Sequence, residues 1–327
     1  MMPVKKKILF MGTPDFAAVI LRALCEKPDM WEVAGVFSQP DKPKGRGHRV
    51  VPTPVKLAAQ EAGIPVYQPQ SLRSGEAAEL LHSISPDVIA VAAYGKILPA
   101  EFLYTPPHGC VNVHGSLLPE YRGAAPIQRA VIDGRRQTGV TIQRMADGID
   151  TGDVLARRTV DILPEDDSGS LFQKIEACGA SLLLETLPLY LEGCIVPEPQ
   201  DDARATYAAK LEKADCRLDF SRSAEELHNL VRGLSPAPLA FSALTRQPAG
   251  EGAETVIKFV KTEIAAESGC CGEPGTVLSV PPAVPGIDIA CGSGVLRLVS
   301  LVPSGKGKMS AADFARGRGI SAGDRFL

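Results

Sequence analysis

"DVIAVAAYG", residues 87–95, is apolar at almost every position. Such a run is typical of a central strand in a parallel sheet, because helices cover both faces of that strand. On either side of it, short apolar runs alternate with helical stretches through the first 190 residues. This alternation predicts an α/β fold with a Rossmann-like parallel sheet and crossover helices.

The individual elements follow from the same pattern. Strands are predicted at 7–12, 31–38 and 64–69, with helices at 14–26 and 53–63 between them. After the opening stretch, the sequence predicts a strand that starts at Cys110, a β-hairpin formed by 138–145 and 153–162, and a long amphipathic helix over 168–193.

The residue composition of the chain changes after residue 193. Pro and Asp cluster first, and short apolar segments between 254 and 303 are then separated by Gly and Pro. This pattern predicts a small OB-like β-barrel. With 327 residues, the chain also exceeds the usual size of one hydrophobic core. We therefore predict a catalytic domain at 1–190, a linker at 191–208 and a β-barrel domain at 209–327.

Composition excludes several classes of protein. Hydrophobic residues make up 45% and charged residues 22%, which suits a globular chain, and the formal net charge of -3 argues against bulk attraction to nucleic acid. No C-x-x-C pair is present, so neither a zinc ribbon nor a thioredoxin-type motif is expected. The apolar run at the start is too short for a signal peptide, and no run reaches the roughly 18 residues of a membrane span. These features predict a cytoplasmic protein that acts away from membranes.

Residues 110–126 read CVNVHGSLLPEYRGAAP and place polar side chains at the end of a strand. Side chains at alternate positions share a face, so Asn112 and His114 point one way while Val111 and Val113 point the other. Ligands of open α/β sheets bind beyond the carboxyl ends of the strands. From this segment alone, a ligand site and a purely structural role are equally consistent. In the structural role, Asn112 and His114 only form hydrogen bonds with backbone groups of the loop.

A second polar stretch, MADGIDTGDVLARR, places Asp147, Asp150 and Asp153 in a turn between the two hairpin strands. D-T-G also occurs in aspartic proteases, but their chemistry needs two facing carboxylates and only one D-T-G is present. Taken alone, Asp and Gly here indicate a turn.

Two glycine-containing stretches do not predict a nucleotide site. FMGTPDF, after the first strand, lacks the further glycines of a dinucleotide fingerprint. GKGK at 305–308 has neither P-loop spacing nor a preceding strand.

Together, the two polar stretches predict acyl transfer to an amine. The carbonyl oxygen becomes an oxyanion as the amine attacks, and Asn112 and a protonated His114 can donate hydrogen bonds to it. Asp150 can hold His114 charged and relay protons. No serine or cysteine nucleophile is needed.

These residues also carry a family resemblance. NVHGSLLPEYRGAAPIQRAVIDG and DGIDTGDVL resemble the folate-dependent formyltransferases, and FMGTPDFA, QPDKPKGRG, AYGKILP and RGAAPIQRA resemble the branch that acts on methionyl initiator tRNA. YAAKLEKADCRLDF and PSGKGKMSAADFARG extend the resemblance into the carboxyl-terminal part.

The resemblance implies transfer of a formyl group from 10-formyltetrahydrofolate to the amine of methionyl initiator tRNA, for translation initiation. It implies catalytic roles for Asn112, His114 and Asp150. It further implies that a folate site is lined by Ser116, Leu117, Leu118 and Pro119. The enzyme is expected to be a monomer that requires no metal.

Cations cluster in two places that would suit the tRNA. In the loop SQPDKPKGRGHRV, four cations oppose only Asp41, and the tail from Ser304 is also basic. The predicted tRNA-binding residues are Lys42, Lys44, Arg46, Arg49, Lys306 and Lys308.

Two alternatives stay open. A formyltransferase for a small amine, such as a ribonucleotide or an amino sugar, would not need the basic loop or the second domain. A non-catalytic RNA-binding module would not need Asn112, His114 and Asp150 at the rim of a sheet.

Overall fold

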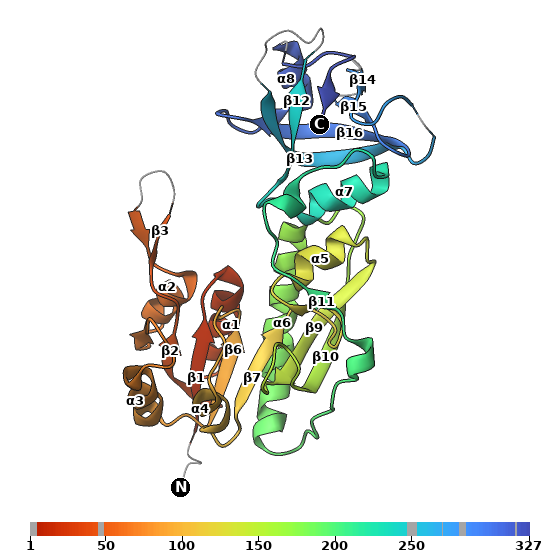
Figure 1. Cartoon of the computed structure of the whole chain (residues 1–327). Coiled ribbons are helices and arrows are strands. Elements are labelled where there is room, and N and C mark those ends of the chain that lie inside the picture. Colours follow the sequence, from red (N-terminus) through yellow and green to blue (C-terminus); the bar gives the residue numbers. More distant parts are fainter. Residues whose placement is uncertain (1–4, 45–48, 247–253, 270, 281–285, 318) are drawn as a thin grey trace. The chain divides into compact units, whose positions relative to one another are not determined.

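The computed structural model describes residues 5–44, 49–246, 254–269, 271–280, 286–317 and 319–327 (Figure 1). The chain divides into two compact units. Unit 1 comprises Met1–Pro126, Gln137–Asp161 and Phe172–Ala208. Unit 2 comprises Ile127–Arg136, Ile162–Leu171 and Ala209–Leu327.

Unit 1 is built on a seven-stranded sheet in the order β10-β9-β7-β6-β1-β2-β5 (Figure 1). Its strands are β1 (Lys6–Gly12), β2 (Trp31–Phe37), β5 (Val66–Tyr67), β6 (Val88–Ala92), β7 (Cys110–His114), β9 (Gln137–Arg144) and β10 (Asp153–Asp161). The first five run parallel, whereas β9 is antiparallel to both β7 and β10. Every residue of β6 is buried. The predicted parallel sheet and the β9–β10 hairpin are thus confirmed.

The helices predicted at 14–26, 53–63 and 168–193 are present as α1 (Asp15–Cys25), α2 (Pro54–Glu61) and α6 (Ser168–Leu191). The structure adds α3 (Gly75–Ile84), α4 (Ala100–Tyr104) and α5 (Pro126–Ile132). The Thr53 side chain accepts from the backbone N–H of Lys56 and so caps α2. In α6, a Cβ on Gly179 would lie 2.8 Å from Cγ1 of Val113, so a glycine there lets the helix approach β7 closely.

Two short pairings accompany the main sheet. β3 (Lys42–Lys44) and β4 (Arg49–Val51) form an antiparallel hairpin within the segment that the sequence predicts as a loop. β8 (Arg122–Gly123) pairs in parallel with β11 (Tyr207–Ala208), which follows the single-turn 3₁₀ helix η1 (Asp202–Arg204). The end of the predicted linker therefore pairs with a strand of unit 1. The boundaries at 190 and 208 stay a prediction.

Unit 2 forms the predicted barrel. Its elements are η2 (Ala214–Cys216), α7 (Ala224–Gly233), β12 (Ala240–Thr245), β13 (Thr255–Ala266), β14 (Val277–Ser279), β15 (Ile287–Ala290), β16 (Val295–Pro303), β17 (Met309–Ser310), α8 (Ala311–Arg316) and β18 (Arg325–Phe326). The strand order is β14-β15-β16-β13-β12-β18, all pairs are antiparallel, and β17 adds to β16. A bridge between Thr276 and Arg325 brings the two ends of the sheet together. The rings of Phe220, Phe259 and Phe326 pack against one another in its core.

No helix in the described ranges is both long and apolar enough to cross a membrane.

Candidate active site at the carboxyl end of β7

Strand β7 ends in two polar side chains that are nearly buried. Asn112 is 8% and His114 is 6% exposed. In the neighbouring strand β9, Gln143 pairs with Asn112 and Thr141 pairs with His114. Among the described residues, the Asn112 side-chain amide has no hydrogen-bond partner. It is therefore available to a ligand.

The imidazole of His114 faces a different protein group at each nitrogen. Nε2 lies 3.0 Å from the carbonyl oxygen of Tyr121. A carbonyl oxygen can only accept, so Nε2 carries a hydrogen and donates it. Nδ1 lies 3.5 Å from Oδ2 of Asp150. The ring is thus held between a neutral acceptor and a carboxylate.

The carboxylate of Asp150 is fixed through both oxygens. Oδ1 accepts from Nε2 of Gln143 over 2.8 Å, and Oδ2 accepts from the backbone N–H of Gly123 over 2.9 Å. These bonds hold Oδ2 at its position facing Nδ1 of His114. The predicted pair is therefore brought together by three separate segments of unit 1.

The other two carboxylates of the same turn have different partners. Asp147 accepts from the Tyr104 hydroxyl over 2.8 Å, and Asp153 pairs with Arg144 over 2.7 Å. A Cβ on Gly152 would overlap the carbonyl oxygen of Arg144, so this turn requires a glycine there. Of the three aspartates, Asp150 faces His114.

Cys110 shares the face of β7 but supplies no nucleophile. Its thiol donates to the carbonyl oxygen of Phe102 over 3.1 Å, and burial raises its pKa to about 12. A thiol with that pKa stays protonated near neutral pH.

The predicted folate residues form a tight turn after β7. Thr141 organises this turn, because its hydroxyl donates to the carbonyl oxygen of Ser116 over 2.7 Å and accepts from the N–H of Leu118 over 3.0 Å. Leu118 is 1% exposed, and Pro119 is also buried, whereas Leu117 is partly exposed. Of the two leucines, Leu117 therefore offers the more accessible apolar surface.

Comparison with known proteins identifies the family. Residues 6–187 match the family model described as "Formyl transferase", and residues 210–319 match "Formyl transferase, C-terminal domain". The chain belongs to the formyl transferase family. The resemblance read from the motifs is thereby confirmed.

Relatives of this formyl transferase match along nearly its whole length. A protein of Bacillus subtilis (strain 168) is 44% identical over 97% of this chain and 96% of its own length. One of Myxococcus xanthus (strain DK1622) is 46% identical over 98% of each chain. Both are named methionyl-tRNA formyltransferase.

Solved structures share the fold of this formyl transferase at low sequence identity. HypX from Aquifex aeolicus in complex with tetrahydrofolic acid has a TM-score of 0.60 at 19% identity, covering 95% of this chain and 47% of HypX. The N-formyltransferase from Helicobacter canadensis, solved with folinic acid and dTDP-3-aminofucose, has a TM-score of 0.62 at 16% identity, covering 90% and 99%.

The basic hairpin β3–β4 of this formyl transferase is held at its base by a polar cluster. Lys56 donates to Asp41 over 2.6 Å and to Gln68 over 2.9 Å, and Gln68 donates to Asp41 over 2.7 Å. Burial raises the pKa of Asp41, but the hydrogen bonds from Lys56 and Gln68 outweigh it and lower the pKa below its usual value. The cluster therefore keeps Asp41 ionised and paired at the base of the hairpin.

Of the predicted tRNA-binding residues in this hairpin, Lys42 is exposed, and Lys44 and Arg49 pair within the ladder. Arg46 lies outside the described residues.

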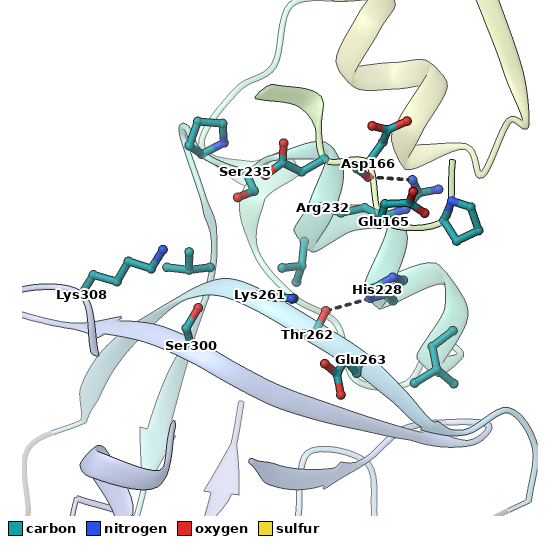
Figure 2. A pocket seen from close by; sticks show the side chains of 16 residues that line it. Glu165, Asp166, His228, Arg232, Ser235, Lys261, Thr262, Glu263, Ser300 and Lys308 are labelled. Carbon is teal, nitrogen blue, oxygen red and sulfur yellow. Dashed lines mark hydrogen bonds between the residues drawn. The ribbon is translucent and has the colours of Figure 1, made fainter. Parts of the chain in front are cut away.

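Lys306 and Lys308 are both exposed residues of unit 2. Lys308 lines a cavity of about 670 Å³ between α7, β13 and residues 164–167 (Figure 2). Within this cavity, Arg232 donates to the carbonyl oxygen of Asp166 over 3.0 Å. Asn112, His114 and Asp150 do not line it, so it is separate from the candidate active site.

Four residues around the His114–Asp150 pair were not predicted from the sequence: Gln143, Tyr121, Gln200 and Thr206. The sequence does contain a pattern that indicates Gln143. Thr141 and Gln143 occupy alternate positions of β9, and polar residues at alternate positions of a strand share a face. No sequence pattern indicates Gln200 or Thr206, since they lie in the segment predicted as a linker.

No group of three or more His, Cys, Asp or Glu side chains in the described part of the chain could hold a metal ion.

Proposed function

We propose that this formyl transferase moves the formyl group of 10-formyltetrahydrofolate to the free amino group of methionyl initiator tRNA, giving N-formylmethionyl-tRNA for translation initiation. The observation that carries the proposal is the unpartnered amide of Asn112, on the same face of β7 as the His114–Asp150 pair. Relatives that match nearly the whole chain and are named for this reaction support the choice of acceptor.

The reaction requires charge stabilisation and two proton transfers. The amine nitrogen forms a bond to the formyl carbon, and the carbonyl oxygen becomes an oxyanion. The bond between that carbon and N10 of the folate then breaks. The attacking nitrogen loses a proton and N10 gains one, so the step balances without a covalent enzyme intermediate.

Each candidate catalytic residue has one role in this reaction. The Asn112 amide donates a hydrogen bond to the oxyanion, and His114 donates from a protonated Nδ1. Asp150 stabilises the charged ring and accepts the proton that the amine loses, directly or through water. The 3.5 Å between Nδ1 and Oδ2 is longer than an ordinary hydrogen bond, so the Nδ1–H group is still able to donate to a substrate oxygen that lies in the plane of the ring.

The formyl donor is proposed to lie against the turn of Ser116, Leu117, Leu118 and Pro119. Leu117 supplies apolar surface to the flat pterin, and backbone groups of the turn read its edge.

The tRNA is proposed to contact the cations of the basic hairpin, Lys42, Lys44, Arg46 and Arg49, and in the barrel Lys306 and Lys308. Phosphate contacts by such side chains supply most of the affinity for nucleic acid. In this proposal residues 1–190 are catalytic, 191–208 connect the domains and 209–327 bind tRNA. The enzyme acts as a monomer in the cytoplasm.

The test is a formylation assay with 10-formyltetrahydrofolate as donor. Methionyl initiator tRNA is compared with methionyl elongator tRNA, free methionine and a small amine such as an amino-sugar nucleotide. Initiator tRNA should react far faster than the others. Preferential formylation of the small amine would refute the assigned acceptor.

A variant tests the observation that carries the proposal. In Asn112→Asp the shape is kept, but a carboxylate oxygen replaces the donor and repels the oxyanion. We expect kcat to fall at least about a hundredfold. Wild-type kcat in this variant would remove Asn112 from the mechanism.

A further inference from the structure

The two polar groups that face the ring nitrogens of His114 among the described residues belong to residues with left-handed backbone. Tyr121, whose carbonyl oxygen accepts from Nε2, has φ +58°, and Asp150, whose Oδ2 faces Nδ1, has φ +53°. Residues other than glycine rarely adopt this conformation, and it persists where the surrounding structure determines it strongly. Contacts with other parts of the protein must therefore stabilise this conformation at Tyr121 and at Asp150.

Asp150 is held by Gln200. Nε2 of Gln200 donates to the carbonyl oxygens of Asp150, over 2.9 Å, and Gly152, over 2.6 Å. Oε1 of Gln200 accepts from Nε and Nη2 of Arg122, over 3.1 Å and 2.9 Å. Since Arg122 is 2% exposed, it fixes the orientation of the Gln200 amide, with the NH₂ group toward the turn.

Tyr121 is held by Thr206. The Thr206 hydroxyl accepts from the backbone N–H of Tyr121 over 2.8 Å. The backbone of Thr206 also accepts from the N–H of Arg122 over 2.8 Å and donates to the carbonyl oxygen of Pro119 over 3.3 Å. One residue thus bonds to three neighbours of the carbonyl group that orients His114.

Gln200 and Thr206 belong to one segment, residues 198–208, here called the clamp segment. Its first residue, Glu198, pairs with Val154 through two backbone hydrogen bonds of 2.8 Å and 2.9 Å. Its last two residues form β11, which pairs with β8. The segment is therefore paired at both ends with other strands of unit 1, to which it belongs, and it lies outside the matched range 6–187.

We infer that Gln200 and Thr206 are positioning residues of the active site, which set the geometry between Asp150 and His114. This inference rests on the proposed function, because it assumes that the His114–Asp150 pair acts in the reaction. The clamp segment is then part of the catalytic machinery as well as a connection between domains.

Two isosteric variants remove one clamp each. Gln200→Glu keeps an acceptor for Arg122 but places an oxygen against the carbonyl oxygens of Asp150 and Gly152. Thr206→Val keeps the shape of the side chain but offers the N–H of Tyr121 no acceptor, and Thr206→Ser restores the hydroxyl. Val196→Thr is the matched control, since Val196 is 89% exposed in the adjoining part of the predicted linker.

The readouts are kcat and the KM for each substrate in the full-length enzyme, with the thermal unfolding midpoint. We expect Gln200→Glu and Thr206→Val to lower kcat roughly tenfold to a hundredfold, since small misplacements of catalytic groups cost that much. The KM values should stay within about twofold of wild type, because substrate contacts are kept. Thr206→Ser should recover most of the lost kcat, and Val196→Thr should match wild type.

Two results would overturn the inference. One is unchanged kcat in both Gln200→Glu and Thr206→Val. The other is a loss of kcat that follows the loss of folded protein and is not recovered in Thr206→Ser, because the clamp segment would then be structural only.

Asp150→Asn, assayed in parallel, separates this inference from the proposed function. If Asp150→Asn is inactive while the clamp variants are fully active, the positioning role alone is wrong. If Asp150→Asn is fully active, the proposed role of Asp150 is wrong and the positioning role is wrong with it.

Discussion

The side chain of Gln143 donates to Oδ1 of Asp150 over 2.8 Å, while its own Oε1 is buried without a hydrogen-bond partner in the described ranges. A buried acceptor without a partner costs about 1–3 kcal/mol. This unfavourable free energy arises next to the proposed catalytic carboxylate. We therefore expect Gln143 to serve activity rather than stability.

Gln143→Met separates these two effects. The variant removes the unpartnered oxygen but leaves Oδ1 of Asp150 without its donor, so we expect the free energy of unfolding to change by less than about 1 kcal/mol. We expect kcat to fall about tenfold, because the carboxylate can rotate away from His114. Urea unfolding and steady-state kinetics measure the two. Unchanged kcat would show that Gln143 has no part in orienting Asp150.

Asp150→Asn tests the carboxylate itself. Both of its oxygens accept hydrogen bonds, so an amide NH₂ group at either position would face a donor. We expect kcat to fall at least about a hundredfold with little change in tRNA affinity. Asp153→Asn is the control, since Asp153 lies in the same turn but pairs with Arg144, and it should keep near-normal kcat. Equal losses in the two variants would contradict a specific role for Asp150.

Thr141→Val tests the turn proposed to bind folate. The hydroxyl of Thr141 is fully buried and bonds to both Ser116 and Leu118, so its loss should destabilise the protein by about 1–3 kcal/mol. The KM for 10-formyltetrahydrofolate should rise, because the turn loses its fixed shape. Thermal unfolding and folate titrations of kcat check this. An unaltered folate KM in a destabilised variant would place the donor elsewhere.

The carboxylate of Glu226 caps the N-terminus of α7, and its contribution to stability depends on pH. Hydrogen bonds from the backbone of Ser223, from Arg222 and from the Ser223 hydroxyl lower its pKa to about 2. Because the folded-state pKa is depressed, the stabilisation is present above the unfolded pKa of about 4.3 and is lost as pH falls toward about 2.

We therefore expect the difference in thermal midpoint between wild type and Glu226→Gln to be largest near neutral pH. It should shrink steadily from about pH 5 to about pH 3. The expected difference in thermal midpoint is small, since the Glu226 side chain is half exposed and solvent screens its charge. Glu225→Gln, at the neighbouring position of the first turn, should show a weaker pH dependence. A difference that does not vary with pH would contradict the assignment to this carboxylate.

Arg46→Ala tests the basic hairpin as a tRNA contact. We expect a lower kcat/KM for methionyl initiator tRNA and unchanged folate binding, and the salt dependence of log kcat/KM should weaken by about one unit of slope. Lys27→Ala, which removes an exposed cation just after α1, is the control. An unchanged salt dependence in Arg46→Ala would show that Arg46 does not contact phosphate.

Local pattern was sufficient to predict most of the fold. The apolar run of β6 predicted a strand covered on both faces, and the alternation around it predicted the parallel sheet, because burial of apolar side chains follows the periods of strands and helices. The sequence predicts the segment of β3 and β4 as a loop instead, since it contains Gly, Pro and several basic residues and has no run of apolar residues.

For the candidate site, the sequence by itself determined which side chains β7 presents and that aspartates crowd the turn before β10. Only the tertiary structure decided that Asp150 faces His114, that Gln143 and Gly123 fix its carboxylate, and that Gln200 and Thr206 reach the same place. The physical reason is that these contacts join segments far apart in the chain, and their hydrogen bonds form only once the sheet and its loops have brought the backbone within about 3 Å.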